Sequence, residues 1–140
     1  MMHIDYEAVL GVIAGEIEEL LTPAGADAPA LPVMIGPLPP TEGVGVTMAS
    51  GTVRRDLAGN AMAVIRLGVN VKLASQQDAV SLMSGIHGEI ADLTGAAEDG
   101  SWQITGCSVL ATPAAVRQDS DGHWLCTSTV QVRATFYLEE

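Results

Sequence analysis

Positively charged residues are scarce in this chain of 140 residues. Six lysines and arginines face 17 aspartates and glutamates, so the formal net charge is -11 and the sequence pI is about 4.4. A protein that binds a useful DNA footprint neutralises roughly six to ten phosphates. This chain would need every cation for that purpose while its surplus carboxylates repelled the same backbone. The charge balance therefore excludes tight nucleic-acid binding, and it disfavours anionic membranes for the same reason.

Cysteines, aromatic residues and long apolar runs are also few. No stretch approaches the roughly 20 apolar residues that span a bilayer, and MMHIDYEAVL has no basic region followed by an apolar run, so we expect neither a membrane span nor a signal peptide. The two cysteines, Cys107 and Cys126, fit a reduced cytosolic setting. A disulfide between them requires their strands to pair. With 4% aromatic residues, the core must consist mainly of Val, Ile, Leu, Ala and Met.

The apolar residues suit one domain over residues 1–140. A chain of this length buries about two thirds of its unfolded surface without help from metals or disulfides. Residues 22–43 hold six of the seven prolines, which predicts an extended, irregular segment. Because this segment contains the apolar island LPVMI, we expect it to lie over the fold or against a neighbouring subunit.

Two segments have the periodicity of amphipathic helices. The first covers residues 4–21, with Asp5 as a candidate N-cap and Thr22-Pro23 as its end. The second runs from Ser75 to Gly95, and Ser75 followed by an acidic residue three positions later resembles a capping box.

Alternating apolar and polar residues predict two hairpins. Residues 44–48 and 65–73 form the first, with the polar tip RRDLAGN. Residues 102–118, interrupted at Pro113, and 124–138 form the second, joined by the turn DSDGH. The order α-β-β-α-β-β predicts a single α+β domain whose mostly antiparallel sheet carries both helices on one face.

Patterns of catalytic or metal sites are weak. Neither His3 nor His123 has a second ligand at the spacing of a metal site. DSDGH (119–123) resembles the start of a calcium loop, but the third ligand is missing and Val130 stands where the bidentate glutamate belongs, which favours a hairpin turn. GVGVTM (43–48) lacks the third glycine of a dinucleotide fingerprint. We expect no enzymatic activity, no cofactor and no metal.

His87 lies beside the apolar stripe of the second helix. We expect a partly buried histidine that holds the helix to the sheet by a hydrogen bond, most simply to a backbone carbonyl. Gln76 and Gln77 open the same helix, and we expect them to cap or dock it.

A family resemblance rests on residues 65–90 and 102–137. An extended strand leads into a helix that opens with Gln76-Gln77 and carries His87 near its middle, followed by a Trp-initiated strand, Pro113, an acidic turn and a final alternating strand that begins at Trp124. This pattern resembles the minor capsid or tail-terminator proteins of long-tailed bacteriophages. The resemblance covers residues 60–140 best, and the proline-rich segment departs from it.

The resemblance implies a structural protein made in the bacterial host cytoplasm and located in the tail or neck of the virion. Such proteins form a ring, usually of six copies, that caps the tail tube and docks it to the head connector while DNA passes through the lumen. The implied partners are other copies of the chain, the tail-tube protein and the connector protein. An acidic, cation-poor ring would repel phosphates and let the duplex slide.

Ring formation needs an interface between copies, and two segments are candidates. One is the apolar island at Met34 and Ile35, and the other is the hairpin tip at Arg54, Arg55 and Asp56, whose arginines suit a neighbour's acidic helix face. The alternatives are another head-tail joining or tail-tube protein, a small-molecule or peptide-binding module with an apolar pocket, and a hydrolase with a cleft that joins a histidine, a carboxylate and a nucleophile.

Overall fold

The computed structural model describes residues 4–36, 38, 41–91 and 93–137, and it describes only the backbone of residues 111–115. His3 and the side chain of Pro113 lie outside the described parts. The helices are α1 (Tyr6–Leu21) and α2 (Gln76–Ile90), and the strands are β1 (Val33–Ile35), β2 (Gly43–Arg55), β3 (Ala61–Leu73), β4 (Gly95–Ala96), β5 (Trp102–Gln118) and β6 (Trp124–Phe136).

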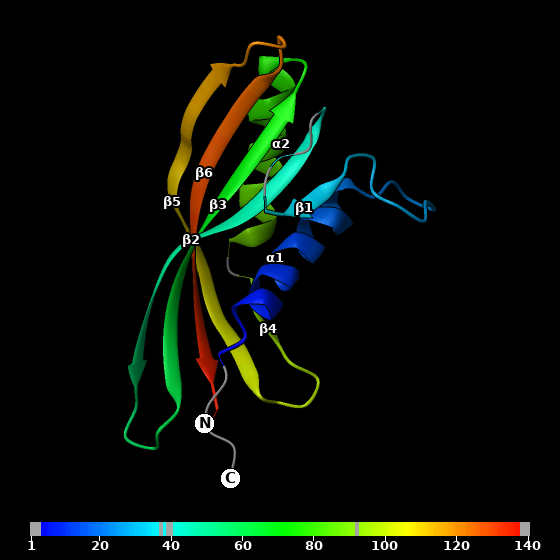
Figure 1. Cartoon of the computed structure of the whole chain (residues 1–140). Helices are drawn as coiled ribbons and strands as arrows, with labels where there is room; N and C mark the ends of the chain where they lie inside the picture. The colour runs from blue at the N-terminus through cyan, green and yellow to red at the C-terminus, as the bar shows by residue number, and fades with distance from the viewer. Residues whose placement is uncertain (1–3, 37, 39–40, 92, 138–140) are drawn as a thin grey trace.

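The strands form one sheet in the order β1-β2-β3-β6-β5-β4. Only β1 and β2 pair in parallel, and the four other neighbouring pairs are antiparallel. The long central strands twist strongly along their length (Figure 1). The α+β class and the mostly antiparallel sheet are therefore as expected from the sequence.

The expected element order is wrong, because the described chain runs α-β-β-β-α-β-β-β. The additional strands β1 and β4 have three and two residues, too short to show an alternating pattern. Tertiary pairing creates them. The N–H of Gly36 donates to the carbonyl of Val46 and the N–H of Val44 to that of Pro32, both at 2.9 Å, and these bonds attach β1 to the edge of β2.

The expected interruption at Pro113 is confirmed only in part: β5 is assigned as one strand from Trp102 to Gln118, but its pairing with β6 is irregular around Pro113. β4 pairs with β5 only at residues 103 and 104, so the rest of β5 forms an edge of the described sheet. The register between β5 and β6 shifts between Ala111 and Ala115. Proline has no N–H to donate, and it is tolerated at an edge or a register shift because no ladder hydrogen bond is lost there.

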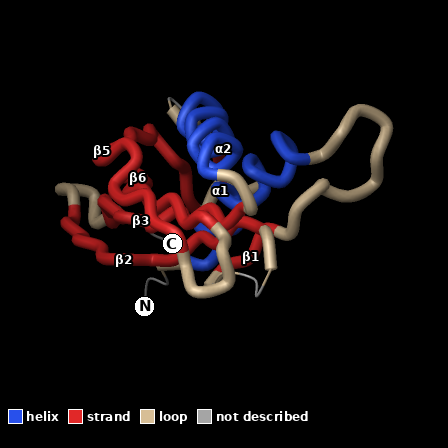
Figure 2. The backbone as a smooth tube through the Cα atoms, turned by 90° about the horizontal axis from the view of Figure 1, so that it is seen from above, coloured by secondary structure: helices blue, strands red, loops and turns tan. Residues whose placement is uncertain are grey.

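Both helices cover the same face of the sheet (Figure 2). α2 contacts β3, β5 and β6, whereas α1 contacts β1, β2 and α2. The buried residues of both helices belong to one core with the inward positions of β3, which alternate with less buried ones. The core includes Val9, Ile13, Ile17, Ile65, Leu67, Val69, Met83, Ile86, Ile90, Val130 and Val132. Each large aliphatic side chain buried in this way contributes about 1.5–3 kcal/mol.

The cap of α1 agrees with the sequence pattern. The carboxylate of Asp5 accepts a hydrogen bond from the N–H of Ala8 at 3.0 Å, so it satisfies one of the free donors at the start of the helix. Neither helix in the described part of the chain has the length and apolarity needed to cross a bilayer.

Candidate functional site

Asp56 closes the turn between β2 and β3. Its Oδ1 accepts hydrogen bonds from the N–H groups of Ala58 and Asn60, each at 2.9 Å, and its Oδ2 accepts one from the amide of Asn60 at 3.1 Å. The backbone hydrogen bond from Asn60 is the main reason that the pKa of Asp56 is below its ordinary value. Arg55 donates to the carbonyl of Gly59 at 3.0 Å. Asp56 and Arg55 thus shape the hairpin tip.

Arg54 and Arg55 project from opposite faces of β2. Arg54 is paired with Met62, an exposed position of β3, whereas Arg55 is paired with Ala61, which is fully buried on the helix side. Consequently, the hairpin-tip residues predicted as one interface do not form one surface. Leu57 is fully exposed in the same turn, and sequence reasoning did not single it out because apolar residues in turns carry no periodic signal.

Met34 and Ile35 lie on β1, the outermost strand at one side of the sheet. Their side chains are 42% and 48% exposed and, as neighbours on one strand, point to opposite faces of the sheet, so both faces of that edge expose an apolar side chain. An exposed apolar edge strand is a usual site of contact with another chain. The structure places these two residues on a different strand and edge from the hairpin tip.

The sheet face turned away from the helices carries arginines from three neighbouring strands. Val64 on β3 is paired with Thr52 on β2 and with Arg133 on β6, and Arg66 follows two positions later on the same side of β3. Arg54, Arg66 and Arg133 are all exposed. We call these three arginines and the strand surface between them the cationic face.

The cationic face is free of opposing carboxylates within its strands. Inside the described bounds of β2, β3, β5 and β6 there is no aspartate or glutamate. Lys72 and Arg117 also lie on this side of the sheet, toward its other end, where Lys72 pairs with Asp119 at 3.3 Å. Sequence alternation assigns Arg66 and Lys72 to the solvent-facing side of their strand. Only strand register places Arg133 opposite Val64 and Arg54 opposite Met62, on the same face as Arg66.

A shallow groove of about 310 Å³ crosses the cationic face. Met62 and Val64 lie along its floor, and arginine and threonine side chains flank them. The residues that line it are Thr52, Arg54, Met62, Ala63, Val64, Thr105, Arg133, Ala134 and Thr135. Guanidinium and hydroxyl groups beside an apolar floor can bind a carboxylate together with the aliphatic part of the segment that carries it.

The helix layer on the other side of the sheet carries a carboxylate cluster. Burial raises the pKa of Glu16, and the neighbouring charges of Glu19 on α1 and Glu89 on α2 raise it further. The last turn of α1 has no basic residue, although the carboxyl end of a helix has partial negative charge. We call Glu16, Glu19 and Glu89 the acidic end.

His87 joins α2 to the sheet. Its Nε2 lies 2.7 Å from the hydroxyl of Ser128 on β6, so the partner is a side chain instead of the expected backbone carbonyl. Burial lowers the pKa of His87. A serine next to a histidine is also the beginning of a nucleophilic site, but Ser128 is 2% exposed and faces the core beneath α2, on the side of the sheet opposite to the groove.

The N-cap of α2 is Ser75, whose hydroxyl accepts a hydrogen bond from the N–H of Asp78 at 3.3 Å. Gln76 and Gln77 form the first turn with exposed side chains. The capping role expected for the two glutamines is therefore filled by the residue that precedes them.

The two cysteines lie on paired strands but not opposite each other. Cys107 on β5 is paired with Val132, and Cys126 on β6 is paired with Val116. Both thiols are free, and burial raises the pKa of Cys107 to about 11 and also raises that of Cys126. Because the thiolate is the reactive form, neither thiol has the properties of a nucleophile at neutral pH.

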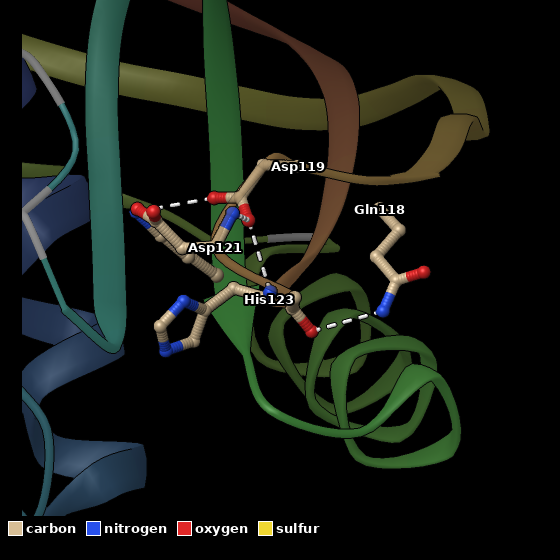
Figure 3. A network of polar contacts seen from close by, with 6 residues as sticks. Gln118, Asp119, Asp121 and His123 are labelled. Atoms are coloured by element: carbon tan, nitrogen blue, oxygen red, sulfur yellow. Dashed lines mark hydrogen bonds and ion pairs between the residues drawn. The ribbon is translucent and has the colours of Figure 1, made fainter.

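The DSDGH sequence forms the turn between β5 and β6 (Figure 3). Oδ1 of Asp119 accepts hydrogen bonds from the N–H groups of Asp121 and His123, each at 2.9 Å. Burial alone would raise the pKa of Asp119, but these bonds and the ion pair with Lys72 outweigh it, so the pKa is lowered.

The same turn brings three metal-ligating side chains together, which sequence spacing did not predict. One ligand atom each of Asp119, Asp121 and His123 lies within 4.8 Å of the others, and the Nδ1 of His123 is buried without a hydrogen-bond partner. The ammonium group of Lys72 lies 3.3 Å from Asp119, where it supplies positive charge to the cluster. The hydrogen bonds of the turn and the ion pair hold Asp119 in place.

Comparison with known proteins does not assign the chain to a family. No protein-family model matches the sequence, and no curated protein matches it either.

Proposed function

We propose that this protein is a structural component of a long-tailed bacteriophage, a tail terminator or minor capsid protein whose copies form a ring between tail tube and head connector. The observation that carries the proposal is the separation of charge between two opposite faces, with arginines on the open sheet face and a carboxylate cluster on the helix layer. Unlike faces on one subunit favour head-to-tail association, which gives a ring when the rotation between copies closes. The resemblance of residues 60–140 supplies the biological setting.

The net charge is consistent with a conduit for DNA. If all six cations of a copy were paired with carboxylates of its neighbours, 17 − 6 = 11 carboxylates per copy would remain unpaired. An annulus of several copies therefore stays strongly negative, and its bore would repel phosphates and leave the duplex free to slide.

Electron microscopy of particles made without this protein tests the proposal. We expect over-long tails that are not attached to heads, because the tube would lack its terminator. Filled heads that leak DNA would instead identify a head-completion protein, which is the nearest alternative. Particles of normal length and attachment would contradict both assignments.

The groove on the cationic face supports a second candidate, a module that binds an acidic peptide or small molecule. Its volume of about 310 Å³ lies at the lower end of the range for small-molecule sites, and it is a surface depression flanked by charged side chains. A virion ring and a peptide-binding module differ in where the bound carboxylates come from. In a ring, another copy of this chain supplies the carboxylates, whereas a binding module takes them from a separate ligand.

A further inference from the structure

We infer that the cationic face of one copy binds the acidic end of a second copy. The contact places Glu16, Glu19 and Glu89 of one subunit against Arg54, Arg66 and Arg133 of the next. This inference deepens the proposed function by naming the interface through which the ring would form.

The positive charges of the cationic face are not neutralised by carboxylates of its own strands. Arg66 is exposed between Ile65 and Leu67, whose side chains are buried on the other side of the sheet, so it projects into solvent. Arg133 lies on the adjacent strand, beside Val64, about 5 Å from it in the direction of the hydrogen bonds. Because the strands around them carry no carboxylate, these guanidinium groups repel one another unless an outside anion neutralises them.

The acidic end carries unneutralised negative charge, whereas the cationic face carries unneutralised positive charge. Glu16 and Glu19 lie one turn apart on α1, and Glu89 lies on α2, which contacts α1. Burial raises the pKa of Glu16, and the charges of Glu19 and Glu89 raise it further. Glu19 also lies in the last turn of α1, at the negative end of the helix dipole, where cations are favoured and carboxylates are not. A cationic partner would relieve both penalties.

The two surfaces also match in their apolar parts. Leu20 lies one turn after Glu16 on α1 and is 37% exposed. Met62 on the floor of the groove is 43% exposed and is flanked by Arg54 on the neighbouring strand. An exposed leucine among carboxylates fits an exposed methionine among arginines, so contact would bury apolar area as well as pair charges.

Nucleic acid fits the cationic face less well than a second copy does. Three arginines can replace counterions at about three phosphates, which would give only a shallow salt dependence of roughly 0.9 per phosphate. The rest of the molecule, with its net charge of -11, would repel the polyanion at every longer distance. A second copy presents a compact carboxylate cluster at the contact itself.

The contact is head-to-tail, because the helices cover one face of the sheet (Figure 2) and strand register places the three arginines on the other. Each copy keeps one cationic face and one acidic end available, so association continues until the copies close into a ring or extend as a filament.

Charge reversal on each surface tests the inference with the full chain. One variant carries Arg66→Glu and Arg133→Glu, and the other carries Glu16→Lys and Glu19→Lys. Sedimentation velocity over a concentration series should show that each variant alone associates at least about tenfold more weakly than the wild type. An equimolar mixture should associate again, because the reversed sheet face of the first variant meets the reversed helix end of the second.

Arg117→Glu is the control for net charge. Arg117 lies on the same side of the sheet, beside Leu125, which separates it from Lys72, and it is about 20 Å along the strands from Arg66. We expect it to associate like the wild type. Thermal unfolding of every variant checks that the fold is retained.

Three outcomes would overturn the inference. Variants that associate like the wild type, or a mixture that stays dissociated, would show that copies meet through other surfaces, and the proposed ring would survive. A wild-type chain that is monomeric at about 1 mM would also overturn it. The proposed function is tested separately, by electron microscopy of particles made without the protein.

Discussion

At the scale of single residues, the polar side chains of His87 and Ser128 each interrupt an apolar row, and they contact each other between helix and sheet. His87 lies beside the stripe of α2, and Ser128 occupies an inward position of β6 in phase with Val130 and Val132. Each deviation from the apolar pattern could be read from the sequence. Their pairing could not, because 41 residues separate them and only the packing of α2 on β6 brings their atoms to 2.7 Å.

Replacing His87 with Gln should lower the free energy of unfolding by about 1–2 kcal/mol, the cost of a lost buried hydrogen bond. Denaturant unfolding of the variant measures this change. The Ser128→Ala variant and the double variant complete the cycle, and their effects should be less than additive. Loss of self-association by His87→Gln with unchanged unfolding would contradict the structural role.

Acidification should destabilise the protein through His87. Its pKa in the folded state is below the ordinary value of 6.5. Between that lower pKa and 6.5, the unfolded chain binds a proton that the folded chain does not, so the free energy of unfolding falls as the pH decreases through this window. Unfolding curves from pH 8 to pH 5 should show a smaller decrease for His87→Gln, and parallel pH profiles of variant and wild type would refute the assignment.

At the scale of elements, the sequence patterns predict the elements with long periodic runs and miss the short ones. α1, α2 and the four long strands follow from periods of 3.6 and 2 residues. β1 and β4 exist because an available strand edge pairs with a short segment. The same reason explains β5, which continues through Pro113 because its edge position requires no N–H there.

Removing the hydroxyl of Ser75 should destabilise α2. Ser75→Ala leaves the N–H of Asp78 without its cap, and we expect a loss of about 1 kcal/mol in the free energy of unfolding. Gln76→Ala and Gln77→Ala are matched controls one and two positions later, with exposed side chains, and each should change stability by less than about 0.5 kcal/mol. A larger effect at either glutamine would restore the capping role expected from the sequence.

At the scale of the whole molecule, overall charge and local charge differ in sign. The chain has a net charge of -11, yet the strands of its open face contain arginines and no carboxylates within the described bounds. Carboxylates are confined to helices, turns and connecting segments in the part of the chain that the structure describes. Such a molecule repels polyanions at long range and can still bind a carboxylate cluster at contact.

Arg54 and Arg55 should therefore behave differently, although they are neighbours in the sequence. Arg54→Glu places a carboxylate in the groove and should weaken self-association about tenfold. Arg55→Glu reverses a charge on the other face of β2 and should leave the association constant unchanged. Light scattering on both variants compares them directly, and equal effects would mean that the hairpin tip acts as one surface.

The sequence by itself determined the α+β class, both helices, the long strands, the polar DSDGH turn and the acidic surface. These features depend on local periodicity, turn residues and composition, which neighbouring residues determine. Only the tertiary structure decided the strand order, the two short strands, the bond between His87 and Ser128, and the grouping of Arg54, Arg66 and Arg133. These depend on register and helix packing, which join residues far apart in the chain.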